Sequence, residues 1–293
     1  MLKGSIVALV TPFDKKGFVD EKKLRFLVDW HIKNKTDAIL VCGTTGESAT
    51  LTHQEHRTVI DIAIDQARCR VPIIAGCGSN STSEALELAE FSHQRGADYA
   101  LVITPYYNKP TQTGLYKHFR TIADKVKIPI IIYNVPSRTG INILPSTVVS
   151  LYKDCKNIIG IKEASGSLDQ MEKIMTLVDD KFRLFSGDDG LTVPILSIGG
   201  VGVISVVANI MPKQTHDMVE SFLNKDFQKA KKIQLYMYDL IKVMFIETNP
   251  IPVKTALSMM GFIEDNFRLP LCGMEKDNKN LLTLTLKKYK LIK

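Results

Sequence analysis

Short apolar runs alternate with longer amphipathic segments over the first 225 residues. The runs are rich in β-branched residues and apolar at nearly every position, which is typical of strands covered on both faces. They span Ser5–Val10, Ala38–Val41, Pro72–Ala75, Tyr99–Ile103, Ile130–Tyr133, Ile158–Lys162, Phe182–Ser186 and Gly202–Val206. Between them, apolar residues recur at helical spacing, as in Leu24, Leu27, Val28 and Ile32. Such alternation predicts an α/β fold, a closed (β/α)8 barrel rather than an open sheet.

Helix boundaries can also be predicted from particular residues. Asp20 precedes Glu21, and Thr52 is followed three residues later by Glu55, which is the pattern of a capping box. The first helix has no glycine where it should end. We expect Asn34 to take the left-handed conformation there, with Lys35 after it.

From residue 226 onward the pattern contains helices only. They are predicted at Asp226–Phe245, Pro252–Met260 and Asn278–Lys288. We therefore predict a catalytic barrel over residues 1–225 and a helical appendage over residues 226–293.

Composition is that of an ordinary globular protein, with 45% hydrophobic and 24% charged residues. The net charge of +7 comes from scattered Lys and Arg. Because no basic stripe with interleaved aromatics is present, a solvated surface is favoured over a nucleic-acid groove. Five cysteines without a CxxC pair argue against disulfides and zinc, and favour a reducing cytoplasm. There is no signal peptide and no apolar run long enough to span a membrane.

Candidate chemistry lies at the ends of the predicted strands, where barrels of this kind carry their active sites. Lys162 closes an apolar strand and could act as an amine nucleophile. Only the neutral amine attacks a carbonyl, and burial in an apolar barrel favours that form. The alternative is an ion pair with Glu163 or Asp188.

Other strand ends carry polar groups that suit a keto acid. Thr44 and Thr45 stand between glycines, in a turn that could cradle a carboxylate or be purely structural. Tyr133 could relay protons or simply pack. Arg138 could bind a carboxylate with two hydrogen bonds or lie on the surface.

Metal and nucleotide chemistry find little support. His53 and His56 are three residues apart on a predicted helix, and no third ligand is evident, so the residues alone indicate a partly exposed helix face. Neither GxGxxG nor GxxxxGK[ST] occurs, which argues against a nucleotide enzyme.

Together these motifs resemble the dihydrodipicolinate synthase family. The resemblance extends from Gly4 to Pro270 and rests on Gly43–Glu47, Tyr106-Tyr107, Tyr133–Gly140, Gly160–Ala164 and Asn249–Lys254. The wider superfamily contains N-acetylneuraminate lyase and keto-deoxy sugar acid aldolases. Arg138 and the doubled Thr44-Thr45 favour the synthase. Two departures, Lys35 in place of a common glycine and Thr248 in place of a common proline, are not expected to touch the site.

The resemblance implies a mechanism without an added cofactor or metal. Lys162 forms an imine with pyruvate, and the derived enamine attacks L-aspartate 4-semialdehyde to give 4-hydroxy-tetrahydrodipicolinate, the first step of the diaminopimelate and L-lysine branch. Proton relay and substrate binding are implied for a further set of residues. These are Tyr133, Thr44 and a neighbouring subunit's Tyr107 for protons, Thr45 for pyruvate, Arg138 for the semialdehyde carboxylate, and the carbonyls of Gly187 and Ile204.

The resemblance also implies feedback inhibition by L-lysine, bound at the tight dimer interface of a homotetramer arranged as a dimer of dimers. The matching positions are Ser48, Ala49, His53, His56, Asn80, Glu84 and Tyr106. The two histidines would then form a ligand wall rather than a bare helix face.

Two alternatives remain open. The first is another pyruvate-dependent aldolase that acts on a keto-sugar acid, which Arg138 argues against. The second is a non-catalytic barrel that senses a ligand or binds nucleic acid, which the net charge motivates. Trapping of a pyruvate imine on Lys162 would separate these classes.

Overall fold

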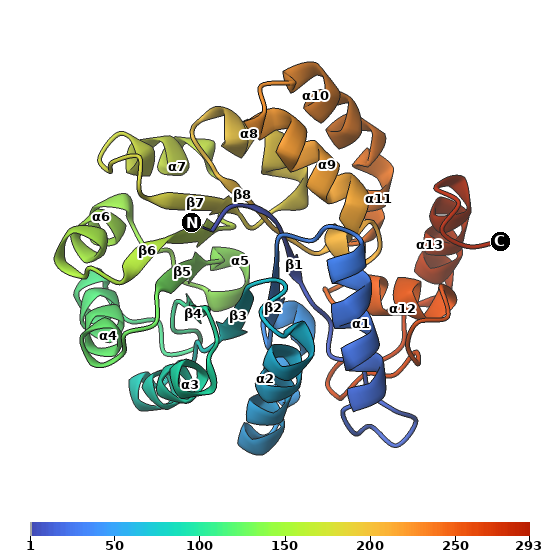
Figure 1. The fold of residues 1–293 in the computed structure, drawn as a ribbon, viewed down its shortest axis with the longest axis horizontal. Coiled ribbons are helices and arrows are strands. Elements are labelled where there is room, and N and C mark those ends of the chain that lie inside the picture. Colours follow the sequence, from blue (N-terminus) through green and yellow to red (C-terminus); the bar gives the residue numbers. More distant parts are fainter. Residues whose placement is uncertain (1) are drawn as a thin grey trace.

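The computed structural model describes residues 2–293 and contains a closed barrel of eight parallel strands, each paired with the next and the last with the first (Figure 1). The strands are β1 Gly4–Ala8, β2 Ala38–Val41, β3 Ile73–Gly76, β4 Tyr99–Ile103, β5 Ile130–Asn134, β6 Ile158–Glu163, β7 Arg183–Ser186 and β8 Gly202–Ser205. The predicted (β/α)8 barrel is thus confirmed, and every strand lies within two residues of its predicted ends.

The strands are apolar at successive positions because both of their faces are covered. In β1, Ile6 and Ala8 belong to a cluster inside the barrel, whereas Val7 belongs to a second cluster between the strands and the surrounding helices. Tyr133 and Phe185 lie in the inner cluster, which therefore fills the barrel. The barrel is closed at its centre, and any ligand site must lie toward its mouth.

Helices surround the barrel in the order of the chain (Figure 1). They are α1 Glu21–Lys33, α2 His53–Ala67, α3 Thr82–Arg95, α4 Gln112–Lys125, α6 Pro145–Asp154, α7 Leu168–Met175, α8 Thr192–Ser197 and α9 Pro212–Leu223. The short helix α5 Pro136–Thr139 lies inside this ring, directly after β5. The predicted capping box is present: Glu55 N donates to Thr52 Oγ1 at 3.2 Å, and Thr52 N donates to Glu55 Oε2 at 2.9 Å. Asp20 likewise accepts from Lys23 N at 2.9 Å.

The end of α1 differs from the prediction. Asn34 has φ −98° and is not left-handed, whereas Lys35 has φ +65°. The Asn34 side chain instead donates to Trp30 O at 2.8 Å and so satisfies a carbonyl of the last helical turn. The left-handed residue is therefore displaced by one position, onto the lysine.

Four helices follow in the C-terminal segment, namely α10 Phe227–Tyr236, α11 Tyr238–Val243, α12 Ile251–Met259 and α13 Lys276–Lys288. The single helix predicted over Asp226–Phe245 is wrong, because the chain bends at Met237. On one side of the bend α10 packs against α9, and on the other α11 packs against α13. Leu240 and Leu257 join the same outer core as the barrel residues, so the division at residue 226 stays a prediction.

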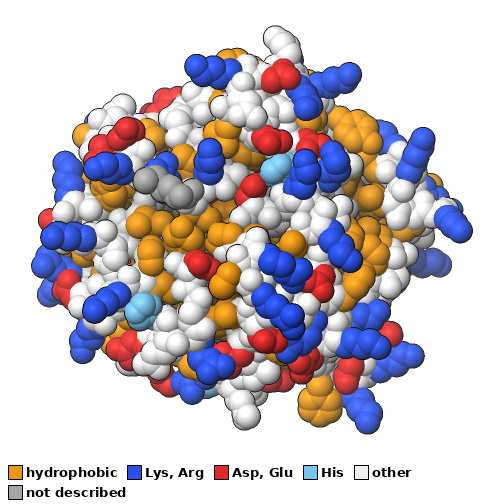
Figure 2. Space-filling model, in the orientation of Figure 1, with side chains coloured by type: hydrophobic (Ala, Val, Ile, Leu, Met, Phe, Trp, Pro, Cys, Tyr) orange, Lys and Arg blue, Asp and Glu red, His pale blue; other side chains and the backbone are white. Residues whose placement is uncertain are grey.

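Lys and Arg side chains are spread among Asp and Glu on the face drawn in Figure 2, without gathering in one stripe. None of the helices within residues 2–293 combines the length and the apolar character that crossing a bilayer requires.

Candidate active site

Strand register places Lys162 beside Tyr133. Lys162 is on β6 and Tyr133 on β5, and the two residues are direct partners in the parallel pair. The Lys162 Nζ atom lies 4.2 Å from the centre of the Tyr133 ring, and both side chains are buried. A phenol and an amine at the same height of the barrel can act on one carbonyl carbon.

Neither neighbouring carboxylate pairs with this amine. Glu163 points to the other face of β6, where Asn134 Nδ2 and Gln170 Nε2 each donate to it at 3.0 Å. Asp188 Oδ1 accepts from Gly190 N at 2.8 Å. The ion pair considered as the alternative role of Lys162 is therefore not formed, and the amine faces the cavity.

Gly187 provides room for the lysine side chain. A Cβ atom at this position would lie 3.2 Å from Lys162 Cε and 2.7 Å from the Ala164 side chain. Gly187 N also donates to Glu163 O at 2.8 Å, which fixes the loop after β7 next to β6. A side chain at 187 would therefore clash with Ala164 and crowd the end of Lys162.

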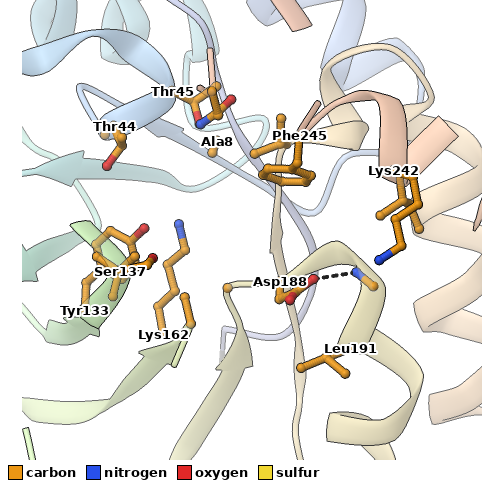
Figure 3. Close-up of a pocket in the computed structure, with 18 of the residues that line it drawn as sticks. Ala8, Thr44, Thr45, Tyr133, Ser137, Lys162, Asp188, Leu191, Lys242 and Phe245 are labelled. Carbon is orange, nitrogen blue, oxygen red and sulfur yellow. Dashed lines mark hydrogen bonds between the residues drawn. The ribbon is translucent and has the colours of Figure 1, made fainter. Parts of the chain in front are cut away.

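A cavity of about 750 Å³ opens at the carboxyl ends of the strands around Lys162. Thr44, Thr45, Tyr133, Ser137 and Arg138 line it on one side, as predicted for four of them. In Figure 3 the Lys162 amine points up between Tyr133 and Asp188, toward the side that carries Thr44 and Thr45. The site thus combines an amine, a phenol, two hydroxyls and a guanidinium, which suits the binding and activation of a keto acid.

The outer part of the same cavity is formed by the C-terminal helices. Lys231, Tyr238, Lys242 and Phe245 of α10, α11 and the following turn line it opposite the loop after β7. Asp188 is the one carboxylate in the lining of this cavity. Because Arg138, Lys231 and Lys242 also line the cavity, its net charge is positive and favours anionic ligands.

Two predicted residues do not line this cavity. Ile204 is buried in the inner barrel cluster, and Val206 lines the cavity on that side instead. Tyr107 is 88% exposed in the single chain, with φ +71°, on the loop after β4. The chain by itself therefore does not bring Tyr107 to Lys162.

A second cavity, of about 520 Å³, lies on the other side of the loop after β2. Six of the seven positions predicted for L-lysine line it: Ser48, Ala49, His53, His56, Glu84 and Tyr106. The seventh, Asn80, is absent from the lining, although its carbonyl accepts from Asn108 Nδ2 at 2.9 Å nearby. Ser79, which the sequence did not indicate, lines the cavity and donates to Glu84.

The walls of the second cavity have a definite electrostatic character. Burial lowers the pKa of His56, whose Nε2 lies 2.7 Å from Gly76 O, so the ring is neutral and donates to that carbonyl. Burial, together with the nearby Glu84 carboxylate, raises the pKa of Tyr106 and keeps it a phenol. His53 Nδ1 lies 3.5 Å from Glu84 Oε1. Glu84 is thus the group best placed to meet a ligand's ammonium.

A buried ion pair fixes the position of the loop that separates the two cavities. This loop consists of two 3-10 turns, η1 (Thr44–Gly46) and η2 (Ser48–Thr50), joined by Glu47 with φ +52°. The fully buried Lys254 of α12 donates to Glu47 Oε1 and stacks 4.2 Å from the Phe13 ring. Burial lowers the pKa of Lys254, and the attraction of Glu47 opposes this. The C-terminal segment therefore fixes the loop on which both cavities depend.

Possible metal ligands lie elsewhere. The ligand atoms of His216, Asp217 and Glu220 on α9 are within 4.8 Å of one another. His216 Nδ1 already lies 2.9 Å from Asp37 Oδ2, and Lys213 pairs with Asp217 at 2.6 Å. Because Asp37 precedes β2, this group sits at the end of the barrel opposite Lys162. It has no part in the candidate active site.

Asn249 is the main site residue that the sequence interpretation did not assign. It lines both cavities, and it contacts Thr45 and Arg138 through hydrogen bonds of 2.9 and 3.1 Å. Asn249 lies more than 200 positions from Thr45 in the chain, so sequence spacing could not predict their contact. The only indication in the sequence was that Asn249 belongs to the Asn249–Lys254 motif.

Known proteins match this chain over its whole length or nearly so. The family model described as the Dihydrodipicolinate synthetase family matches residues 1–289. The 4-hydroxy-tetrahydrodipicolinate synthase of Trichlorobacter lovleyi is 55% identical over 292 residues, which cover 100% of each chain.

Two solved structures of relatives bear names that mention ligands. The chloride-inhibited dihydrodipicolinate synthase from Acinetobacter baumannii, complexed with pyruvate, is 44% identical with a TM-score of 0.97 over 100% of each chain. The enzyme from Cyanidioschyzon merolae with lysine bound is 40% identical with a TM-score of 0.96 over 99% of each chain.

Proposed function

The chain belongs to the Dihydrodipicolinate synthetase family and is an enzyme of the lyase class, and from this premise we propose that it condenses pyruvate with L-aspartate 4-semialdehyde through an imine on Lys162. The product would be 4-hydroxy-tetrahydrodipicolinate, at the entry to diaminopimelate and L-lysine synthesis. The observation that carries the proposal is the buried Lys162 amine beside the Tyr133 ring, at 4.2 Å, in a cavity with Thr45 and Arg138.

Imine formation begins with the neutral Lys162 amine, which adds to C2 of pyruvate. The amine nitrogen gives up two protons, which Tyr133 would relay to the keto oxygen, and this oxygen leaves as water. Thr44 would connect Tyr133 to the partner subunit's Tyr107, so that the proton is exchanged with solvent. Thr45 and the neighbouring backbone N–H groups would hold the pyruvate carboxylate. The covalent imine makes a separate organic cofactor unnecessary.

Carbon–carbon bond formation follows from the imine. Loss of a methyl proton converts it to an enamine, whose terminal carbon bonds to the aldehyde carbon of the semialdehyde. The aldehyde oxygen takes up a proton and becomes the hydroxyl. The amine of the semialdehyde then attacks C2 and displaces Lys162, which closes the ring and frees the enzyme. Arg138 would hold the semialdehyde carboxylate during these steps, and Gly187 leaves space for the lysine to move.

Borohydride trapping tests the covalent step. Incubation with pyruvate and borohydride should add one reduced pyruvyl group to Lys162, located by peptide mass spectrometry. Absence of the adduct would refute the imine and favour a ligand-sensing barrel.

Substrate identity needs a separate assay. Turnover with pyruvate plus the semialdehyde should far exceed cleavage of sialate or keto-deoxygluconate, because Arg138 matches a second carboxylate. Turnover of the sugar acids alone would assign the chain to another pyruvate-dependent aldolase.

We further propose that L-lysine inhibits the enzyme by binding in the second cavity. Support comes from Glu84, His56 and Tyr106 in its wall and from the lysine-bound relative. Glu84 would pair with an ammonium group, and Tyr106 would donate its phenol proton. Addition of millimolar L-lysine should lower activity and raise the thermal midpoint. If both stay unchanged, inhibition at this cavity is refuted.

We propose a homotetramer built as a dimer of dimers, and we propose that it is located in the cytoplasm. The 88% exposure of Tyr107 supports a contact with a neighbouring chain. Sedimentation equilibrium tests the mass. A Tyr107→Phe variant mixed with a Lys162→Ala variant should recover activity in mixed dimers, since one of the sites would then carry both native residues.

A further inference from the structure

Asn249 lies at the meeting point of the two cavities, although it belongs to the C-terminal segment between α11 and α12. It is 6% exposed and lines both cavities. The proposed mechanism gives Asn249 no catalytic or ligand-binding role. Its contacts nevertheless join the two residues that would hold the two substrates.

Two polar groups of Asn249 form hydrogen bonds, and a third does not. The side-chain Nδ2 donates to Thr45 Oγ1 at 2.9 Å, and the backbone oxygen accepts from Arg138 Nη2 at 3.1 Å. The side-chain Oδ1 is buried, and within the part of the chain that the structure describes it has no hydrogen-bond partner. A buried carbonyl without a partner costs about 1–3 kcal/mol. An apolar residue of the same size would avoid this cost, so the amide is best explained by what its Nδ2 does.

The bond to Thr45 decides where the threonine proton points. A hydroxyl has one hydrogen to donate and lone pairs that accept. Because Thr45 Oγ1 accepts from Asn249, its own hydrogen must be directed away from Asn249. Thr45 lines the cavity around Lys162, called the catalytic cavity below. A ligand in this cavity can accept the hydrogen of the Thr45 hydroxyl. The threonine is thereby held as a donor toward a ligand before the ligand arrives.

We propose that Asn249 is a positioning residue that orients the Thr45 hydroxyl as a hydrogen-bond donor to the carboxylate of the first substrate. The proposal rests on the proposed function, in which that substrate is pyruvate. It acts through Thr45 and requires no contact between Asn249 and the reacting atoms. Arg138 is held by the backbone oxygen of Asn249, so replacing the side chain leaves that second contact in place.

A double-mutant cycle separates this role from a structural one. Asn249→Leu removes the donor without adding charge, and Thr45→Val removes the hydroxyl with little change in shape. The pyruvate concentration that gives half-maximal borohydride trapping should rise about tenfold in each single variant, the loss of one well-directed hydrogen bond to a carboxylate. In the double variant it should rise no further than in Thr45→Val alone. The KM for the semialdehyde should change less than about twofold, as expected if Arg138 keeps its support.

Controls come from the same segment of the chain. Asn266 donates through Nδ2 to Asp14 O at 2.5 Å, away from both cavities, so Asn266→Leu removes a comparable bond and should leave pyruvate trapping unchanged. If Asn249→Leu does not fold, Asn249→Ala serves in the same cycle.

The proposal is overturned if the Asn249 substitution weakens trapping by the same factor in the Thr45→Val background as in the native protein, or has no effect in either. Failure of the proposed function has a different signature, because the native protein itself would then form no pyruvate adduct.

Discussion

The two cavities share a wall but carry opposite charges. The catalytic cavity presents Arg138, Lys231 and Lys242 against the single carboxylate of Asp188. The second cavity is lined by Glu84 and by Glu47, which is paired with Lys254, and Arg138 lines the wall that the two cavities share. The first cavity would thus attract a keto acid, and the second an ammonium group. This difference in charge would direct the two proposed ligands, pyruvate and L-lysine, to different cavities.

The loop between them shows how this separation is built. Thr44 and Thr45 of η1 line the catalytic cavity, and Ser48 and Ala49 of η2 line the second one. Glu47 joins the two turns and is anchored to Lys254. A substitution that moves this loop can therefore change both cavities. For this reason, each variant below is compared for its effect on the two cavities.

Of the variants proposed here, Lys162→Arg should affect the two cavities most differently. The guanidinium keeps the positive charge but does not add to a carbonyl, so kcat should fall on the order of 10⁴-fold or more. The second cavity does not contain Lys162, and the L-lysine-induced rise in thermal midpoint should persist. Coupled activity and thermal-shift measurements on the same preparation check this. Retention of more than about 1% of kcat, on the scale of nucleophile deletions, would contradict the assigned nucleophile.

Lys254→Met should damage both cavities together. It leaves the buried Glu47 carboxylate without its partner, so the free energy of unfolding should fall by about 3–5 kcal/mol in urea titrations. Adding Glu47→Gln should recover part of the loss, because the unpaired charge is then removed.

Lys279→Met is the matched control for this pair. The Lys279–Asp265 contact of 2.9 Å is partly exposed, and its loss should cost less than about 1 kcal/mol. Equal destabilisation by the two methionine variants would show that burial of the Glu47–Lys254 pair has no special importance.

Acid should weaken the helix beside the second cavity. Burial lowers the pKa of His118 to about 4, and its Nδ1 lies 2.9 Å from Thr82 Oγ1 at the start of α3, the helix that carries Glu84. Below the unfolded pKa of about 6.5 the unfolded chain takes up the proton first, so stability is full above that pH and is lost as the pH falls toward 4. The loss is about 1.4 kcal/mol per pH unit, or about 3 kcal/mol over the window.

His118→Gln isolates this contribution. Urea unfolding at about pH 7 and about pH 4.5 should show a smaller acid-induced loss in the variant, by about 2.5 kcal/mol, while other buried histidines contribute equally to both proteins. Parallel losses in the two proteins would refute the assignment to His118.

The smallest expected effect concerns the ligand of the second cavity. Glu84→Gln removes the carboxylate opposite the ammonium group, and the L-lysine concentration for half-inhibition should rise about tenfold. Glu87 on the same helix pairs with Arg57 instead and does not line the cavity, so Glu87→Gln should not change it. An equal shift in both variants would point to a general charge effect rather than to direct binding.

The sequence by itself determined the elements and most of the chemistry along the barrel mouth. The strands were predictable because burial on both faces requires apolar residues at successive positions, and Lys162 and Tyr133 were found because active-site residues follow strand ends. Six residues of the second cavity followed from resemblance to a family. Each of these features lies in a short stretch of chain, where periodicity and motif spacing are informative.

Only the tertiary structure decided how distant segments meet. No local pattern predicted that Lys35 would be left-handed or that the helix would be interrupted at Met237. Likewise, Asn249 reaches Thr45, and Lys254 reaches Glu47, across more than 200 residues. Such contacts depend on the closed barrel bringing its C-terminal segment back over the mouth. Local sequence therefore supplied the reactive groups, and the fold supplied the bonds that aim and support them.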